Sequence, residues 1–379
     1  MNDRLHIVSL IPYKILPAQL GGEKGIAVFN EYLCRQVDLT AITTKNNDPK
    51  YAKGYQLSNT ISNSKIRYAN IFLLFTIRKL LKQTRATHFL IEHPYYGWLA
   101  WLIKKTTNVQ IVVHSHNMEY MRSKSIRRWW WKALKWYEEW VYGFADKTFF
   151  ISEDDRRHAI EHLHAPKGKS IAVTYGIVQS GVPVDEELSK DQIRNTHGID
   201  PGDTLLLFNG ALYHSTNYDA LSAILDHINP HLLERKDFHY KIIVCGKGLP
   251  AFFNNLEAYR DKNVIYAGFV DDISAYFKAA DIFLNPILSG GGVKTKAIEA
   301  LAMNCTVIST PLGALGLNQE VCGNKLKIVD EKNWQRFAEL IIQSASKEEH
   351  TPGAFFNYYL WQNIIARAVA FLQTNHNTL

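Results

Sequence analysis

Short apolar runs rich in β-branched residues alternate with stretches of helical period along the whole chain. The strand-like runs lie at 5–11, 88–91, 109–114, 147–152, 171–174, 204–209, 240–245, 264–266, 281–285, 305–309 and 326–329. The helical stretches lie at 25–36, 71–83, 95–105, 126–144, 218–228, 273–279 and 293–303. Alternation of this kind predicts an α/β fold in which helices cover both faces of parallel sheets.

A polar, turn-rich segment at 179–187 separates two strand–helix series of similar length. We therefore expect two Rossmann-like, doubly wound domains, one at 1–180 and one at 181–354. An apolar segment of helical spacing, at about 355–379, is expected to close the first domain as one long helix. Sheets of this kind bind ligands at the carboxyl ends of their strands, so we expect the domains to face a central cleft.

Composition narrows the class of protein. The 379 residues are 46% hydrophobic and 21% charged, which is ordinary for a globular protein. No apolar run is long enough to span a bilayer, no secretory signal is visible, and the four cysteines lack metal or redox spacing. We therefore expect a cytoplasmic protein. The net charge of +7 favours a polyanionic partner: nucleic acid, anionic lipid or a phosphorylated substrate.

The positive charge is concentrated between Arg127 and Trp136, where basic residues interleave with tryptophan. Such a segment fits peripheral contact with an anionic membrane, binding of a lipid-linked acceptor, or stacking on single-stranded nucleic acid. It also fits an ordinary, partly buried helix with Trp129, Trp136 and Trp140 packed inward. No RNA-binding signature accompanies the segment, so a nucleic-acid partner is not expected.

Three consecutive glycines, Gly290, Gly291 and Gly292, follow the strand-like run at 281–285 and precede the helical stretch at 293–303. A glycine turn that leads into a helix presents unpaired backbone N–H groups and the positive end of the helix dipole, which favour a phosphate. Lys294 and Lys296 add positive charge, and Glu299 follows as a carboxylate suited to sugar hydroxyls. A simple turn is the alternative, and the spacing fits neither the Walker loop nor the dinucleotide fingerprint.

The first half of the chain holds other candidate residues. Gly21 and Gly22 follow the first strand, where glycines either let the backbone approach a ligand or only make a turn. The run His114-Ser115-His116-Asn117-Met118-Glu119 follows another predicted strand, where an α/β domain places its chemistry. Its histidines could equally make only local structural hydrogen bonds. Glu92-His93-Pro94-Tyr95 follows a further strand at an equivalent position.

The ordered set of motifs resembles the retaining, nucleotide-sugar-dependent glycosyltransferases of the GT-B fold, family 4. Residues 290–300 fit the subgroup pattern Gly-x-Gly-x-Lys-x-Lys-x-x-Glu-Ala, and 310–316 fit Thr-Pro-x-Gly-x-x-Gly. Further similarity lies at 116–119, 145–154, 175–177, 208–210, 246–248, 268–272 and 280–281. The resemblance implies an acceptor-side first domain and a nucleotide-sugar-binding second domain.

The resemblance also implies roles for single residues. Glu299 would bind the ribose hydroxyls, Lys294 the diphosphate and His116 the donor sugar, and these three are the expected catalytic residues. The expected donor-binding residues are Gly21, Gly22, Gly210, Gly246, Gly268, Phe269, Val270, Gly291, Gly292, Val293, Lys294 and Glu299. Two departures stand out: Gly291 occupies a position where many members carry glutamate, and the segment 210–217 lacks the arginine and lysine found after that strand in many members.

The resemblance thus predicts a hexosyltransferase that moves a sugar from a UDP- or GDP-type donor to a glycan or lipid-linked acceptor. Retention at the anomeric carbon, a surface-polysaccharide or glycoconjugate pathway and a position at the inner face of the membrane are part of this expectation. We expect no cofactor and no metal, because no Asp-x-Asp pair follows a strand and no His/Cys ligand cluster is visible. The alternatives are a sugar-nucleotide epimerase of the same fold and a non-catalytic scaffold of a polysaccharide-assembly complex.

Overall fold

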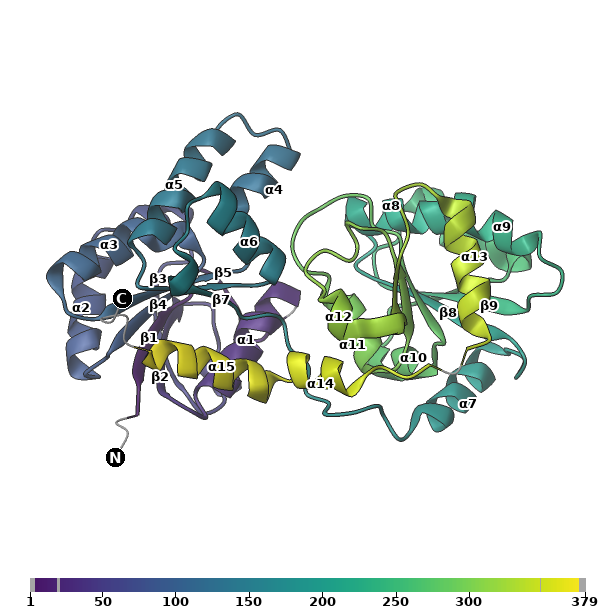
Figure 1. Ribbon diagram of the computed structural model, residues 1–379, viewed down its shortest axis with the longest axis horizontal. Coiled ribbons are helices and arrows are strands. Elements are labelled where there is room, and N and C mark those ends of the chain that lie inside the picture. Colours follow the sequence, from purple (N-terminus) through teal and green to yellow (C-terminus); the bar gives the residue numbers. More distant parts are fainter. Residues whose placement is uncertain (1–3, 19–20, 348, 375–379) are drawn as a thin grey trace. The chain divides into compact units, whose positions relative to one another are not determined.

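The computed structural model describes residues 4–18, 21–347 and 349–374. The chain forms two compact units (Figure 1). Unit 1 comprises Met1–Gly176 and Trp361–Leu379, and unit 2 comprises Ile177–Leu360. The chain passes from one unit to the other twice, so the last helix returns to unit 1.

Unit 1 is built on a seven-stranded parallel sheet of order β3-β2-β1-β4-β5-β6-β7. Its strands are β1 (His6–Leu10), β2 (Asp38–Thr44), β3 (Gln56–Ile61), β4 (His88–Glu92), β5 (Gln110–Ser115), β6 (Lys147–Phe150) and β7 (Ser170–Ala172). Its helices are α1 (Gly21–Leu33), α2 (Leu73–Gln83), α3 (Gly97–Thr106), α4 (Glu119–Ser125), α5 (Trp131–Phe144), α6 (Glu153–His162) and α15 (Trp361–Gln373). Short 3-10 turns lie at Pro49–Tyr51, Lys65–Ala69, Pro94–Tyr96 and Lys167–Lys169.

Helices cover both faces of this sheet, so its central strands are buried on both sides. Every residue of β4 is buried, which explains its unbroken apolar run. On one face, Val8, Phe89 and Ile111 pack in a core with residues of α2, α3 and α5. On the other face, α1 packs beside α15. This core holds the strand ends of unit 1 in fixed positions.

Unit 2 is built on a six-stranded parallel sheet of order β10-β9-β8-β11-β12-β13. Its strands are β8 (Thr204–Asn209), β9 (Tyr240–Cys245), β10 (Val264–Gly268), β11 (Ile282–Asn285), β12 (Thr306–Ser309) and β13 (Leu326–Ile328). Its helices are α7 (Glu186–His197), α8 (Ser215–Ala223), α9 (Asn229–Leu233), α10 (Ile273–Ala279), α11 (Thr295–Ala302), α12 (Gln319–Cys322), α13 (Trp334–Ala345) and α14 (Gly353–Tyr359), with a π-helical turn at Ile224–Ile228 and 3-10 segments at Ala251–Lys262 and Gly323–Lys325. The predicted α/β class with two doubly wound sheets is confirmed.

Several predicted elements have different bounds in the structure. The helix predicted at 126–144 is α5, which begins later, at Trp131, after Arg127 at φ 54; the short helix α4 before it was not predicted. The closing helix is two helices, α14 and α15, separated by Leu360 in an extended conformation. Strands β2 and β3 have no counterpart in the predicted set: β2 is buried but interrupts its apolar residues with threonines, and β3 is a mostly polar edge strand. None of the helices in the described ranges is long and apolar enough to cross a membrane.

Candidate functional site

Each sheet has one place where the strand order reverses, and the candidate residues gather there. In unit 2 the reversal lies between β8 and β11, and in unit 1 between β1 and β4. The loops that leave two such neighbouring strands turn to opposite faces of the sheet and leave a crevice at their carboxyl ends. The glycine-rich loop after β11 borders the crevice of unit 2, and Glu92 borders that of unit 1.

The glycine loop of unit 2 needs glycine at two of its three positions. Gly290 has φ 92 and Gly292 has φ 72, in the left-handed region that side chains disfavour. A Cβ on Gly290 would also lie 3.2 Å from Thr216 Oγ1 in α8. Gly291 is different, because a Cβ there would meet nothing within 4 Å. The loop therefore has room for a side chain at the position where many family members carry glutamate.

Helix α11 begins at Thr295, two residues later than predicted. The backbone amides of Gly291, Gly292 and Val293 therefore belong to the loop and not to the first helical turn. The amides at the helix start are those of Thr295 and Lys296, and these carry the partial positive charge of the helix dipole. The predicted anion site remains at this loop, but its helix amides come from other residues.

Lys294 folds back over the loop that precedes it. Its Nζ donates to the carbonyl oxygens of Gly291, at 2.9 Å, and Gly292, at 3.1 Å. An ammonium group has three N–H donors, so these bonds leave one for a further acceptor. Burial lowers the pKa of Lys294 to about 8. The side chain thus stabilises the glycine loop through two hydrogen bonds and places a positive charge beside it at neutral pH.

Lys296 points toward the neighbouring loop instead. Its Nζ donates to the carbonyl oxygen of Asn209 at 2.7 Å and to Oδ1 of Asn217 at 3.0 Å. A Cβ on Gly210 would lie 2.9 Å from this Nζ, so the glycine makes space for the ammonium group. Burial and the charge of Lys294 lower the pKa of Lys296 to about 8, against the opposing charge of Glu299. Lys296 therefore joins α11 to the end of β8.

Glu299 lies one turn beyond Lys296 on α11 and is partly buried. The residues around it on the helix are apolar and buried, namely Ala297, Ile298, Ala300, Leu301 and Ala302. Its carboxylate is near enough to Lys296 to influence the pKa of that lysine. The structure therefore brings Lys294, Lys296 and Glu299 together at the β8/β11 crevice.

Three predicted glycines follow consecutive strands of the same sheet. Gly210 N donates to Cys245 O at 3.0 Å, and Gly246 N donates to Gly268 O at 2.7 Å, so the ends of β8, β9 and β10 are joined. Gly246 has φ 150, and a Cβ on it would lie 1.9 Å from the carbonyl oxygen of Gly210. Only glycine fits there. The next residues of the β10 loop are Phe269, 68% exposed, and Val270, which is partly buried.

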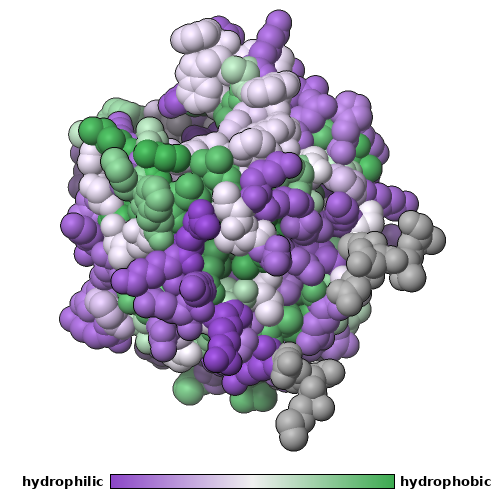
Figure 2. Space-filling model, turned by 90° about the vertical axis from the view of Figure 1, so that its left-hand side faces the viewer, coloured by the Kyte–Doolittle hydropathy of each residue, from purple (hydrophilic) through white to green (hydrophobic). Residues whose placement is uncertain are grey.

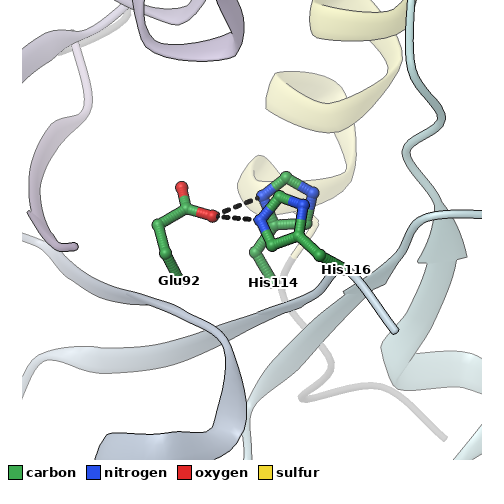
Figure 3. Close-up of side chains that lie close together, drawn as sticks. All are labelled: Glu92, His114 and His116. Atoms are coloured by element: carbon green, nitrogen blue, oxygen red, sulfur yellow. Dashed lines mark hydrogen bonds and ion pairs between the residues drawn. The ribbon is translucent and has the colours of Figure 1, made fainter. Parts of the chain in front are cut away.

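In unit 1, strand pairing brings together Glu92, His114 and His116. Glu92 is the register partner of His114 across β4 and β5. Glu92 Oε2 lies 2.6 Å from His116 Nε2 and 3.0 Å from His114 Nδ1 (Figure 3). Glu92 is fully buried, which by itself would raise its pKa, but the two histidines hold that pKa at about 2. The carboxyl group is therefore ionised; it accepts a hydrogen bond from His116 and lies within ion-pair distance of His114.

His93 and Tyr13 extend this cluster. His93 Nε2 lies 2.7 Å from Tyr13 Oη, and its ring stacks on Tyr95 at 4.9 Å between centroids. His93 has φ 73, an uncommon conformation for a residue with a side chain, of the sort often found at functional sites. Burial lowers its pKa well below the usual value. Burial and the neighbouring His114 lower the pKa of His116 to about 4.

The structure brings together three potential ligand residues that no spacing in the sequence revealed, so the expectation of no metal stays a prediction. One ligand atom each of Glu92, His114 and His116 lie within 4.8 Å of one another, close enough to surround a metal ion. The 2.6 Å from Oε2 to His116 Nε2 is that of a hydrogen bond, so a proton accounts for this contact. Sequence reasoning gave a role to His116, whereas Glu92 and His114 were candidates only through their place at the ends of predicted strands.

Gly21 and Gly22 are the first two residues of α1 and do not form a separate turn. Gly22 lines a pocket of unit 1 whose other lining residues are Tyr13, Lys14, Glu23, Thr44, Asn46, Asn63 and Arg67. Of the predicted site residues, Gly21, Gly22 and His116 lie in unit 1. All the others lie in unit 2.

The basic and aromatic segment from Arg127 to Trp136 joins α4 to α5. Trp129 is 89% exposed and Trp136 is 68% exposed, so the interpretation that both pack inward is wrong. Trp140 does pack against the core. The Arg128 guanidinium lies 5.1 Å from the ring of Trp130. The segment therefore presents indole rings and cations together at the surface.

Unit 1 exposes apolar side chains elsewhere as well. Ile66, Phe72 and Phe75, at the start of α2 and in the turn before it, are 77%, 73% and 65% exposed. Figure 2 shows the side of the molecule that lies at the left in Figure 1, and apolar side chains gather there among polar ones. Large exposed apolar areas of this kind often mark contact surfaces.

Comparison with protein families identifies both units. A family described as Glycosyltransferase Family 4 matches residues 21–178, and one described as Glycosyl transferases group 1 matches residues 203–347. The first match covers most of unit 1 and the second covers most of unit 2. The chain is therefore built from the two domains of a glycosyltransferase of the GT-B type.

Three individual proteins are similar to this chain. A Klebsiella pneumoniae protein described as an uncharacterized 44.6 kDa protein in the cps region is 23% identical over 252 residues. The match spans 65% of this chain and only 56% of that relative. A glycosyltransferase from Rickettsia africae ESF-5 has a TM-score of 0.70 at 14% identity, over 98% of this chain and 100% of that one. Anabaena Alr3699/HepE, solved in complex with UDP, has a TM-score of 0.68 at 11% identity, over 97% of this chain and 98% of that one. At these identities the solved structures show a shared fold.

Proposed function

We propose that this protein transfers a hexosyl group from a UDP- or GDP-type sugar donor to a glycan or lipid-linked acceptor. One observation carries the proposal: the loop around Gly291, the start of α11, Lys294 and Glu299 meet at the strand-order reversal of unit 2. This unit matches the domain described as Glycosyl transferases group 1. The similarity to a structure solved with UDP supports a nucleotide donor.

The proposed chemistry is electrostatic. Breaking the bond between the sugar and the phosphate develops negative charge on the departing diphosphate. Fixed amide dipoles and a nearby ammonium stabilise such charge because they need no reorganisation when it forms. The amides of Thr295 and Lys296, with the free N–H of Lys294, would serve here, and Glu299 would bind the ribose hydroxyls. We propose transfer with retention, without a cofactor or metal, in which the departing phosphate accepts the proton of the acceptor hydroxyl.

The structure offers a physical account of one departure from the family pattern. The loop after β8 has no arginine or lysine of its own between Gly210 and Asn217. Lys296 nevertheless places its ammonium beside Gly210, from α11 on the other side of the crevice. A positive charge thus lies beside the loop after β8, although its ammonium belongs to α11 and is bonded to Asn209 O and Asn217 Oδ1. This supports a variant phosphate site in place of a lost one.

The proposal is tested by calorimetric titration of the protein with UDP and GDP. We expect saturable binding of one of them, and no binding of either would refute the proposal. Lys294→Met should weaken the binding. Lys236→Met is the matched control, because Lys236 is an exposed lysine before the amino end of β9, at the opposite edge of the sheet. Conversion of a sugar nucleotide in the absence of an acceptor would instead indicate the epimerase.

We further propose that the segment from Arg127 to Trp136 contacts an anionic membrane. The acceptor would then be glycosylated at the inner face of that membrane. Exposed indoles beside cations favour the headgroup region of anionic bilayers. Cosedimentation with phosphatidylglycerol vesicles should fall when Trp129 and Trp136 are both replaced by serine. Phe252→Ser is the control, since Phe252 is an exposed aromatic residue of unit 2. Equal cosedimentation of all three proteins would contradict the membrane contact.

A further inference from the structure

The contact between Glu92 and His116 determines which ring nitrogen of His116 carries a proton. An ionised carboxylate only accepts hydrogen bonds. Because His116 Nε2 lies 2.6 Å from Glu92 Oε2, this nitrogen must be the donor, with its proton directed at the carboxylate. Glu92 is fully buried at the end of β4, so its oxygen is held in place by the sheet.

The surroundings of His116 also disfavour a second proton on its ring. The side chain is only 14% exposed. The rings of His114 and His93 lie 4.0 Å and 4.7 Å from it between centroids, so a charged ring would be crowded by further imidazoles. The other titratable groups near the cluster include Tyr13, Tyr68, Tyr95, Glu119 and Arg122, and Glu92 is the carboxylate in direct contact. A neutral imidazole with its proton on Nε2 has a lone pair on Nδ1.

This lone pair is available to a ligand. Within the described ranges, no residue forms a hydrogen bond with His116 Nδ1. The atom is also not one of the fully buried polar atoms without a partner, so it can be reached from outside. The ring lies at the carboxyl end of β5, beside the strand-order reversal of unit 1. A small polar group that approaches this strand end would therefore meet a hydrogen-bond acceptor.

We propose that Glu92 is a positioning residue that fixes the proton of His116 on Nε2, so that Nδ1 accepts a hydrogen bond from a carbohydrate hydroxyl. Hydroxyl groups can donate such a bond, whereas carboxylates and phosphates without protons cannot. The choice of a carbohydrate rests on the proposed function, but the position of the proton does not. Glu92 acts through His116 and does not itself contact the ligand.

The position of the proton is read directly by nuclear magnetic resonance of the full-length protein with ¹⁵N-labelled histidine. The spectrum of His116→Gln assigns the two ring nitrogens by difference. We expect a protonated Nε2 and an unprotonated Nδ1 at pH 7 with no ligand present. The opposite tautomer, or a doubly protonated ring at pH 7, would overturn the proposal. This result stands even if titration with UDP and GDP fails, so the two proposals fail separately.

The role of Glu92 is tested with Glu92→Gln, which keeps the shape of the side chain but offers N–H donors as well as one acceptor. We expect a measurable population of the Nδ1-protonated ring of His116 in this variant. Tyr13→Phe is the matched control, because it removes the hydrogen bond to His93 and leaves both Glu92 and His116 in place. An unchanged proton position in Glu92→Gln would refute the positioning role. If that variant does not fold, the wild-type spectrum still shows which ring nitrogen of His116 carries the proton.

The ligand is tested with two sets of probes. UDP-glucose and UDP-galactose represent a donor, and methyl glucoside and methyl galactoside represent an acceptor. A hydrogen bond accepted by Nδ1 should move its ¹⁵N signal upfield with the probe that supplies the hydroxyl, whereas UDP alone should leave it unchanged. An unmoved signal with all four sugars would overturn the assignment of a carbohydrate hydroxyl.

Discussion

Replacing Lys294 and Lys296 singly with methionine should have opposite effects on ligand binding and on stability. Methionine keeps much of the length of lysine and removes the charge. Lys294 is bonded to two carbonyls of its own loop, Gly291 O and Gly292 O, and keeps one N–H for a phosphate. Lys296 is bonded to groups of other elements, Asn209 O and Asn217 Oδ1. The first lysine is therefore expected to bind ligand, and the second to hold the crevice together.

The magnitudes follow from these contacts. A hydrogen bond to a charged group contributes about 1.5–3 kcal/mol. Loss of one such bond from Lys294 to UDP should weaken binding about tenfold to a hundredfold, since about 1.4 kcal/mol corresponds to a factor of ten. Lys296→Met leaves Asn209 O and Asn217 Oδ1 without their donor, which should cost about 1–3 kcal/mol. In a unit of this size that lowers the unfolding midpoint by about 2–12 °C.

Calorimetric titration with UDP and thermal unfolding measure both effects on the same samples. Lys294→Met should lose affinity with an unfolding midpoint close to that of the wild type. Lys296→Met should have the lower midpoint of the two variants. The reverse result, with stability lost in Lys294→Met and affinity for UDP unchanged, would refute the division of roles.

Two further predictions concern the same site. Binding of UDP should weaken as the pH rises from 7 to 9, because Lys294, with its pKa lowered to about 8, loses its positive charge over this range; titrations that give one affinity at every pH would contradict that shift. Gly246→Ala should destabilise unit 2 by several kcal/mol, about the largest loss seen for single substitutions, because its Cβ would lie 1.9 Å from Gly210 O. Gly291→Ala is the control and should unfold like the wild type, since nothing lies within 4 Å of the added atom. Chemical denaturation of the two variants and the wild type measures the difference.

The fold was accessible from sequence because buried parallel strands are unbroken apolar runs, as β4 and β8 are. Strands β2 and β3 were not accessible, since threonines interrupt the apolar residues of β2 and polar residues make up most of the edge strand β3. The start of α5 was hidden as well. Nothing in the local pattern around Arg127 marks the left-handed residue that precedes the helix.

The candidate site could be located from sequence, but the contacts within it could not. The glycines and lysines between 290 and 296 share one short segment, so their spacing alone placed a cluster of positive charge there. Which acceptor each ammonium meets depends on the packing of α11 beside β8, as the bonds of Lys296 show. Glu92 and His116 are separated by more than a strand–helix step, and only the pairing of β4 with β5 brings them into contact.

The central claim is that the crevice between β8 and β11 binds the diphosphate of a sugar nucleotide. A crystal structure of the protein with UDP tests this claim most directly. The account predicts the diphosphate within hydrogen-bond distance of the amides of Thr295 and Lys296 and of Nζ of Lys294, with the ribose at Glu299. A diphosphate bound elsewhere in the protein, with these groups unoccupied, would contradict it.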